Sequence, residues 1–493
     1  MKFYSVGKGG LPSFLSEKNQ FSFFYYLLFM TYGILSILPI LVVLAIAFWK
    51  KNVFLALIVG LVLASLILSA STADYLVGIR ALSEVFSLPS TSQVIFFLFL
   101  TGAIMHCANK SGGVEGLVRY CTEKRKIVTS RFGVEFFTLV LGLLLFIDAL
   151  SSIIITSSVG KPFFKKYKLP DEKLALISNS TGAAITWLIP FSGAGALMTS
   201  FLAPVVRDLN LEIHPFELLV SSVKYQFYTL SLFLILLCCI FFRKDIGPMR
   251  RLMKDKSLEH HDADFQFGTE IPAGQAPRAF NLVLPVVLLV GIAFAIVYVT
   301  GQGHLIQGDI TIAMFASGIL TLLISGICYI AQGLVTLNQY INWCLEGMHT
   351  MFDVILIFVL AYAFGALLHD LDTAGYVAHY AVLFPEEVIL LAVLFVTSCV
   401  AYAIGSSSAT VALLFPIFVP MAYTLGIPLP YTVGAVVSGA IFGDQNSPIS
   451  DSVILTSQIS GVNILDHVRT QIPYTGCALA MAFLGYGILM WWG

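Results

Sequence analysis

Three aspartates stand inside otherwise apolar stretches of this 493-residue sequence. Asp148 lies in LLLFIDALSSIIITSS, with Ser151 one helical turn later on the same face. Asp444 and Asp451 lie in FGDQNSPISDSVILTS. If these stretches cross a membrane, each carboxylate costs about 2.5–3.5 kcal/mol on insertion scales and marks a functional site by default. The polar residues predicted to complete a site with the three aspartates are Ser151, Ser447, Ser450, Ser452 and Asn179.

The chemistry of such a site is competition between a small cation and a proton. Oxygen atoms bind hard cations such as Na⁺, and a carboxylate can hold either a cation or a proton, so one group can exchange the two. The sequence therefore predicts a site for transported Na⁺ and H⁺, with no resident cofactor. Two alternatives stay open: Asp444 and Asp451 could cap helices beside Pro448, and the hydroxyl-rich break 405–408 fits close helix packing as well as ligation.

Composition places these residues in a membrane protein. Hydrophobic residues make up 58% of the chain and charged residues 11%, a balance that no soluble surface of this length tolerates. Runs such as 280–300 and 311–330 are continuously apolar, which predicts spanning helices and not barrel strands. The net charge of −1 gives no indication of nucleic-acid binding, and the eight cysteines include no CxxC pair typical of a zinc site.

The apolar stretches form two series with the same rhythm, and polar landmarks recur between them. An offset of 263 residues relates Gly102, Ala103 and His106 to Gly365, Ala366 and His369. An offset of 258 residues relates Pro170, Pro190 and Ser192 to Pro428, Pro448 and Ser450. Ordered matches of Gly, His and Pro are harder to obtain by chance than apolar matches, so the sequence predicts an internal duplication.

The duplication defines four segments: an N-terminal segment 1–26, a first transmembrane repeat 27–242, a polar cytoplasmic linker 243–278 and a second transmembrane repeat 279–493. Loops rich in Lys and Arg stay in the cytoplasm, and such loops follow the first, third and last spans of the first repeat. The first repeat therefore runs from outside to inside, while the second must start inside. The repeats are predicted to be inverted.

Short apolar pieces between Arg131 and Arg243 are broken by Pro170, Pro190 and several polar residues. Breaks inside a bilayer free backbone groups, which are tolerated only where they line a polar cavity. We therefore predict an all-α polytopic membrane protein with two inverted-topology repeats and broken or re-entrant helices at the midplane.

Two long motifs resemble a known family. The segment from Gly443 to Tyr474, GDQNSPISDSVILTSQISGVNILDHVRTQIPY, is similar to the pattern GDxxSPxSDTTxLSSxxxGxxxxDHxxTQxPY of NhaC-type sodium/proton antiporters, in the ion transporter superfamily. The segment 146–193, FIDALSSIIITSSVGKPFFKKYKLPDEKLALISNSTGAAITWLIPFSG, resembles the family's FDDxxNSLxxGxxxRPxxDxxxxxxEKLAxxxDSTxxPxxxxxPxSS. The resemblance implies exchange of sodium for protons or, in some members, coupled movement of an organic anion.

The chain departs from the family pattern at several polar positions. Ile147 precedes Asp148 where the family often has paired aspartates, and Ser151 stands in place of an Asn. Asn179 replaces the Asp of DST, and Val453 replaces the second Thr of SDTT. Fewer carboxylates imply either fewer coupled charges or a different substrate. The residues retained are Asp444, Ser447, Pro448, Ser450, Asp451, Ser452, Asp466, His467, Thr470 and Gln471.

The sequence thus predicts a secondary transporter, and no enzyme, that exchanges Na⁺ for H⁺ across the cytoplasmic membrane by alternating access. The alternative on the same scaffold is Na⁺- or H⁺-coupled transport of a small organic anion or amino acid. The expected partners are the lipid bilayer, the small cation and proton, a small organic solute in the alternative case, and a second copy of the chain in a homo-oligomer. Two further classes are an intramembrane hydrolase using Ser406 to Ser408 with His369, and a passive channel.

Overall fold

Helices are the only regular secondary structure in the described part of the chain. The computed structural model describes residues 32–492 apart from 51, 88, 121–129, 147, 210, 255–269, 271, 273–274 and 305–307, and no strand occurs among them. Nine of the described helices are long and apolar enough to cross a membrane. The predicted polytopic all-α fold is confirmed, while the N-terminal segment 1–26, Ile147 and half of the linker 243–278 lie outside the described residues.

The first repeat contains the 3₁₀ helix η1 (Gly33–Ser36), the π-helix η3 (Ser180–Ile185), the 3₁₀ helix η4 (Val223–Tyr225) and a series of α-helices. These are α2 (Leu38–Lys50), α3 (Val53–Thr72), α4 (Val77–Ser87), α5 (Pro89–Lys110), α6 (Gly113–Arg119), α7 (Arg131–Leu144), α8 (Ala149–Tyr167), α9 (Asp171–Asn179), α10 (Thr186–Leu188), α11 (Gly193–Asp208), α12 (Pro215–Ser222) and α13 (Phe227–Phe242). The linker contributes α14 (Met249–Leu252).

The second repeat is built from ten α-helices among the described residues. They are α15 (Phe280–Thr300), α16 (Ile310–Ala331), α17 (Leu337–His349), α18 (Phe352–Asp370), α19 (Thr373–Ala381), α20 (Glu386–Ile404), α21 (Ser407–Thr424), α22 (Leu429–Asn446), α23 (Asp451–Ser460) and α24 (Ile464–Trp492).

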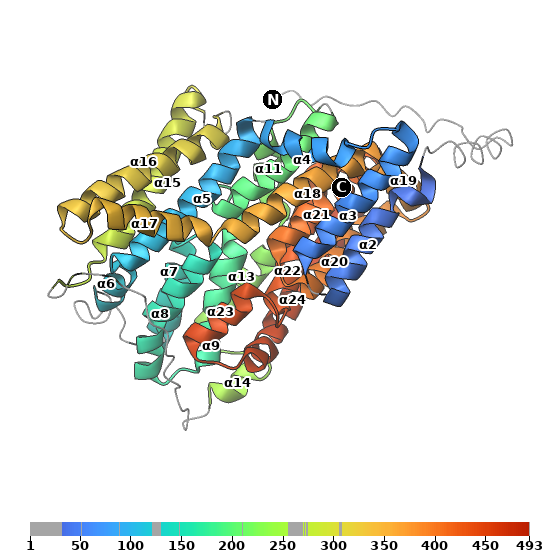
Figure 1. The fold of residues 1–493 in the computed structure, drawn as a ribbon. Helices are drawn as coiled ribbons and strands as arrows, with labels where there is room; N and C mark the ends of the chain where they lie inside the picture. Colours follow the sequence, from blue (N-terminus) through green and yellow to red (C-terminus); the bar gives the residue numbers. More distant parts are fainter. Residues whose placement is uncertain are drawn as a thin grey trace.

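Element boundaries follow the duplication. Helix α8 begins at Ala149 and α21 at Ser407, which is the 258-residue offset seen in the sequence. The same offset relates the start of α9 to that of α22, and the start of α11 to that of α23. In Figure 1, α6 and α19, which follow the equivalent helices α5 and α18, lie at opposite ends of the bundle. The two repeats are therefore inverted, as predicted.

Helices α7 and α8 form a re-entrant hairpin. The α7 helix has 14 residues, about 21 Å, which is too short for a hydrocarbon core of about 30 Å. The Nε atom of Arg131, at the start of α7, donates to the carbonyl of Tyr167, at the end of α8, over 3.1 Å. Both open ends of the hairpin therefore lie on one face of the membrane, and its tip, just before Asp148, lies inside.

A second kind of break interrupts two longer helical paths. Helical structure ends at Leu188 and resumes at Gly193, with Pro190 between them, and it ends at Asn446 and resumes at Asp451, with Pro448 between them. Proline has no backbone N–H and cannot continue the ladder of hydrogen bonds. The first path is also widened by the π-turn η3 just after Asn179, a rare geometry that is common at functional sites.

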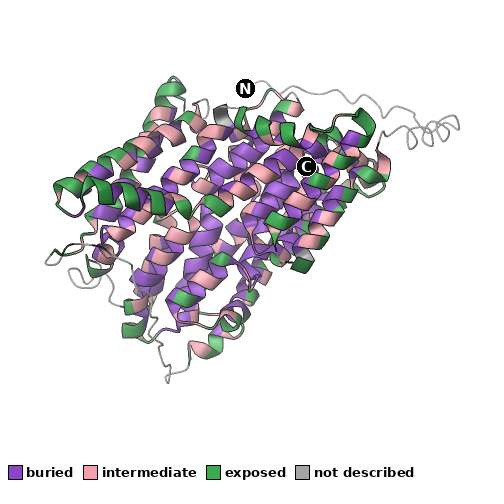
Figure 2. Cartoon of the chain, viewed as in Figure 1, coloured by how far each residue is buried: buried purple, intermediate pink, exposed green. Residues whose placement is uncertain are grey.

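Side-chain burial fits a lipid-embedded bundle. Figure 2 shows buried residues running through the centre and exposed residues along the periphery. Large apolar side chains on outer helices are open, including Leu66 (62% exposed), Val287 (61%) and Ile327 (68%). Helices α4 and α17 were not predicted from the sequence, because they are shorter and more polar than the long apolar runs that indicate membrane spans.

A buried ion cluster ties α7, α9, α13 and α24 together at one face. Lys173 at the start of α9 is fully buried and pairs with Asp245, while its Nζ lies 3.6 Å from Glu135 of α7. The hydroxyl of Tyr474 donates to Asp245 over 2.7 Å. None of these charges was in the predicted site, although Lys173 belongs to the EKLA part of the resembled motif.

We expect Lys173→Met to destabilise the fold, because it leaves two buried carboxylates without a cation. Breaking a buried ion pair costs about 3–5 kcal/mol, so the apparent melting temperature should fall by roughly 5–10 °C. Fluorescence-detected size exclusion of heated, detergent-solubilised protein measures this. The exposed Lys168→Met is the matched control, and adding Asp245→Asn and Glu135→Gln to Lys173→Met should recover part of the loss. Equal melting of Lys173→Met and wild type would contradict the assignment.

Candidate functional site

Asp444 occupies a sealed position at the end of α22, with 8% of its surface exposed. The hydroxyl of Ser450 donates to its Oδ1 over 2.5 Å, and the hydroxyl of Ser407 donates to its Oδ2 over 2.8 Å. Ser452 lies 2.9 Å from Ser450 through their hydroxyl oxygens. Within the described residues no Lys, Arg or His lies within ion-pair distance of Asp444. The carboxyl is therefore buried among hydroxyls without a cation.

Local sequence explains this placement. Helices α20 and α21 form a second hairpin, equivalent to α7–α8, and Ser407 is the first residue of α21, at its tip. Ser450 lies in the break between α22 and α23. Helix α22 packs very closely on α20: a Cβ at Gly443 would lie 2.4 Å from the carbonyl oxygen of Ser398, and a Cβ at Gly439 would lie 2.7 Å from that of Leu394. Glycine at these two positions lets α22 approach closely enough to bring Asp444 to the hairpin tip.

The two repeats differ at this position. At the 258-residue offset, Thr186 stands where Asp444 stands, and Ser192 where Ser450 stands. Ser192 donates to the backbone carbonyl of Thr186 over 2.5 Å. Both serines therefore donate to the residue six positions earlier, but the acceptor is a backbone carbonyl in the first repeat and a carboxylate in the second. The first repeat thus keeps the geometry of the break and lacks the carboxylate.

The other predicted residues near the second break divide into two groups. Ser447 is fully buried and its hydroxyl has no hydrogen-bond partner among the described residues. Asp451, in the first turn of α23, is exposed, and no hydrogen bond joins it to Asp444 in the described part of the chain. The two aspartates are therefore close in sequence but differ in environment.

Asn179 belongs to a buried amide network that crosses the repeat boundary. Its Nδ2 donates to Oε1 of Gln471 over 3.1 Å and lies 3.5 Å from Nε2 of His467. Gln445, next to Asp444, donates to the carbonyl of Asn179 over 3.3 Å and accepts from the hydroxyl of Tyr228 over 2.6 Å. The network therefore connects the π-turn of the first repeat to the residue that follows Asp444.

Several atoms around this network are buried without partners. Buried polar groups usually have a hydrogen-bond partner, so a group of orphans indicates room for water or a ligand. They are Asn179 Oδ1, Ser178 Oγ, Ser180 Oγ, His467 Nδ1 and Ser447 Oγ, counted within the described residues.

Asp148 and Ser151 lie in a different place, on the wall of a cavity of about 250 Å³ between α5, α8 and α23. Asp148 caps α8, since its Oδ2 accepts from the backbone N–H of Ser151 over 2.9 Å. No hydrogen bond among the described residues joins Asp148 to the Asp444 group. Leu455, one turn after Asp451 on α23, lines the same cavity.

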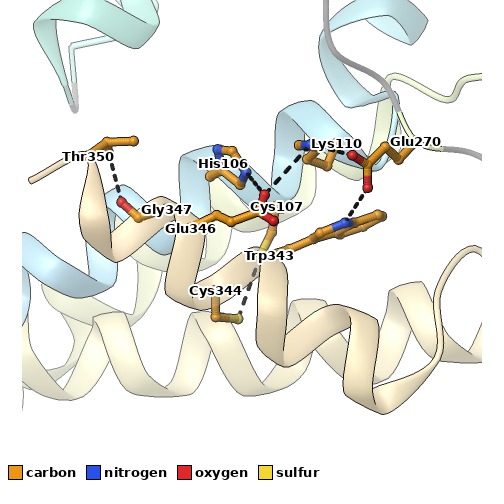
Figure 3. Close-up of polar contacts among 9 residues, drawn as sticks. All are labelled: His106, Cys107, Lys110, Glu270, Trp343, Cys344, Glu346, Gly347 and Thr350. Carbon is orange, nitrogen blue, oxygen red and sulfur yellow. Dashed lines mark hydrogen bonds and ion pairs between the residues drawn. The ribbon is translucent and has the colours of Figure 1, made fainter.

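Charged residues gather around His106, which lines the Asp148 cavity (Figure 3). His106, which lines the cavity, has its Nε2 3.1 Å from Oε2 of Glu346 on α17. Lys110 lies 3.7 Å from the same carboxylate and donates to Glu270 of the linker over 2.5 Å. Glu270 also accepts from Nε1 of Trp343 over 2.8 Å. Glu270 thereby attaches the linker to α5 and α17 beside this cavity.

Comparison with known proteins assigns the chain to a family. A family described as the Na⁺/H⁺ antiporter family matches residues 203–491. The chain belongs to the Na⁺/H⁺ antiporter family. The predicted family is confirmed: the motif 443–474 lies within the matched residues, whereas the motif 146–193 lies outside them. The protein is a multi-pass membrane protein of the secondary-transporter class.

Individual relatives show how widely the likeness extends. An uncharacterized protein of Haemophilus influenzae is 25% identical, over 92% of this chain and 90% of its own length. The malate-2H⁺/Na⁺-lactate antiporter of Bacillus subtilis is 36% identical, but over 27% of this chain and 28% of its own length. The crystal structure of the Alcanivorax borkumensis YdaH transporter, described as having an unusual topology, superposes with a TM-score of 0.57 at 15% identity, over 84% of this chain and 89% of that one. This last likeness concerns the fold alone.

Three residues that our site prediction omitted now stand beside it. Ser407 was left open between packing and ligation, and the structure turns its hydroxyl to Asp444. His467 and Gln471, both retained from the family motif, flank Asn179. The hydrolase alternative finds no geometric support among the described residues, because His369 pairs with Asp370 and no hydrogen bond links its ring to Ser406, Ser407 or Ser408.

We expect the linker contact of Glu270 to be pH-sensitive in acid. Hydrogen bonds from Lys110 and Trp343 hold the pKa of Glu270 below its usual value of about 4.3. A lowered carboxyl pKa adds stability above the unfolded value, and this is lost as pH falls through the folded value. The Trp343 emission, taken as wild type minus Trp343→Phe, should change below about pH 4.3. The change should be absent in Glu270→Gln; a titration that persists there would assign it to another group.

Proposed function

We propose that this protein exchanges Na⁺ for H⁺ across the cytoplasmic membrane by alternating access, with Asp444 holding the proton and the cation in turn. The observation that carries the proposal is the environment of Asp444: a buried carboxyl whose described partners are the hydroxyls of Ser407 and Ser450. An ionised carboxylate without a cation costs several kcal/mol in such a site. The group therefore favours either a proton or a metal cation, and the two compete for one position.

The surrounding groups suit both states. A serine hydroxyl donates to an ionised carboxylate, and the same oxygen can turn a lone pair to a cation. Ser450 and Ser452, with the unpartnered hydroxyl of Ser447, supply oxygen atoms at the break after α22, which hard monovalent cations accept. The broken helix adds backbone carbonyls that no i→i+4 ladder uses.

The remaining predicted residues act before and beside this position. Asp148 and Ser151 line a cavity that also contains His106, and a cation arrives there before it reaches Asp444. Asp451, on the exposed side of α23, attracts the cation to the break. The free Oδ1 of Asn179 provides one more oxygen donor within the amide network.

The network also provides the coupling. Gln445 is bonded to Asn179 and Gln471, so a displacement of the α22 end moves residues of both repeats. Occupation of Asp444 by a proton or a cation neutralises the buried charge and permits that displacement, whereas the empty ionised site resists it. Exchange is then obligatory.

The test is dye-monitored proton movement in sealed proteoliposomes energised with a proton gradient. Addition of Na⁺ should collapse the gradient for wild type, and Asp444→Asn should reduce this to the protein-free background, because an amide cannot exchange a proton for a cation. Asp466→Asn, an exposed aspartate in the same motif, is the matched control and should retain exchange. Normal exchange in Asp444→Asn would remove Asp444 from the mechanism.

A second candidate is coupled transport of a small carboxylate, favoured by the likeness to the Bacillus subtilis malate-2H⁺/Na⁺-lactate antiporter. In that case the orphaned hydroxyls and half-helix N-termini would hold the carboxylate group. Labelled malate, lactate or arginine should then accumulate in Na⁺-gradient proteoliposomes, and unlabelled solute should compete. Uptake equal to that of protein-free liposomes, together with Na⁺-driven proton movement, would decide for simple cation exchange.

A further inference from the structure

A second cavity, of about 150 Å³, lies between α11, α18, α19 and α21. It is separate from the Asp148 cavity and contains none of the predicted site residues. Its wall includes Asp208, Tyr362, His369 and Asp372. The second cavity has no part in the mechanism proposed above.

The two cavities are related by the internal duplication. At the 263-residue offset, Gly102 and His106 line the first cavity, and Gly365 and His369 line the second. Asn109 and Asp372 form a further equivalent pair. Each cavity is also closed by a helix of the other repeat: α23 at the first, and its equivalent α11 at the second. Two unrelated packing defects would not share equivalent walls.

Ion pairs and hydrogen bonds place the cavities at opposite faces. Lys110, one turn beyond His106, pairs with Glu270 of the linker between α13 and α15. Asp245, at the other end of this polar linker, pairs with Lys173 at the start of the helical path 171–208. Asp208 lies at the far end of that path, which has 38 residues and is long enough to cross the membrane. His106 therefore faces the linker side, and the second cavity faces the other side.

The cavities differ in depth. The first reaches Asp148 at the tip of the α7–α8 hairpin. On the equivalent hairpin, the deepest α21 residue of the second cavity is Ala412, whereas the position equivalent to Asp148 is Ser406. Six residues of helix are about 9 Å. Thr410 and Val411, which fill part of this interval, are fully buried. The second cavity is thus closed before the hairpin tip.

The wall of the second cavity is equipped for a polar ligand. Tyr362 is 6% exposed, and its hydroxyl has polar contacts with the side chains of Thr91 and Arg207. Asp208 and Asp372 bring negative charge to the wall, opposed by Arg207, which pairs with Asp208 over 2.9 Å, and by His369 when protonated. Carboxylates on the wall of a cavity raise the local concentration of small cations.

We propose that this second cavity is the entrance for the transported cation from the face opposite the linker, closed in the present conformation by the packed segment Ser407–Val411. The Asp148 cavity is the corresponding entrance on the linker side, and it is open to the hairpin tip. The transported ion is a monovalent cation or a proton, so this inference rests on the proposed function for its cargo. The sidedness of the two cavities does not depend on that function.

The test is the accessibility of the equivalent pair His106→Cys and His369→Cys to a membrane-impermeant, positively charged methanethiosulfonate. Labelling is read at each peptide by mass spectrometry, in right-side-out and in inside-out vesicles, with the native cysteines as internal references. The thiol of His369→Cys should react about tenfold faster from the outer face, and that of His106→Cys about tenfold faster from the inner face. Asn109→Cys and Asp372→Cys form a second pair in case a histidine variant does not fold.

Electrostatics gives a sharper readout. In His369→Cys, the ratio of labelling by cationic to anionic methanethiosulfonate should fall about threefold or more when Asp208→Asn is added, and this should weaken in high salt. The same addition should leave the ratio in His106→Cys unchanged. Reaction of both thiols from one face, or no effect of Asp208→Asn, would overturn the proposal. Correct sidedness without Na⁺-driven exchange would instead reject the proposed function and leave the two entrances standing.

Discussion

The structure depends on one constraint: inside a bilayer, a backbone or side-chain polar group has no water to bond with and must find a partner within the protein. Helix breaks at Pro190 and Pro448 therefore cost free energy unless the freed backbone groups find other hydrogen-bond partners. Here Ser192 and Ser450 take part of that role, one toward a carbonyl and one toward Asp444. The breaks place a carboxylate where neither lipid nor bulk water can neutralise it.

The duplication converts this local arrangement into a transport scaffold. Equivalent hairpins, α7–α8 and α20–α21, bring helix N-termini to the middle of the bundle, and equivalent cavities approach from either end. The repeats have diverged at the centre, since Thr186 and Asp444 occupy equivalent positions and only one of them can ionise. A symmetric frame with one asymmetric charge allows one ion position to be presented to two faces.

In the proposed mechanism, stability and ion exchange depend on different charges. In the cluster of Lys173, Asp245 and Glu135, one lysine pairs with two carboxylates and holds helices together at one face. Asp444 has no such cation among the described residues. A buried carboxylate with its own lysine is a structural element, whereas one surrounded by hydroxyls is available for exchange. The presence of a buried carboxylate does not by itself distinguish a structural residue from an exchange site, whereas the residues that contact the carboxylate do.

The sequence by itself determined the helical membrane fold, the inverted duplication and the family, because apolar runs, ordered Gly, His and Pro matches and a long motif are all local or periodic signals. Only the tertiary structure decided which polar residues meet. Asp148 and Asp444 looked alike in sequence, yet one caps a helix at a cavity wall and the other is sealed among serines. Ser407 reaches Asp444 across 37 residues, and Asn179 reaches Gln471 across 292. Such contacts depend on how the helices pack, so they cannot be predicted from the spacing of residues along the chain.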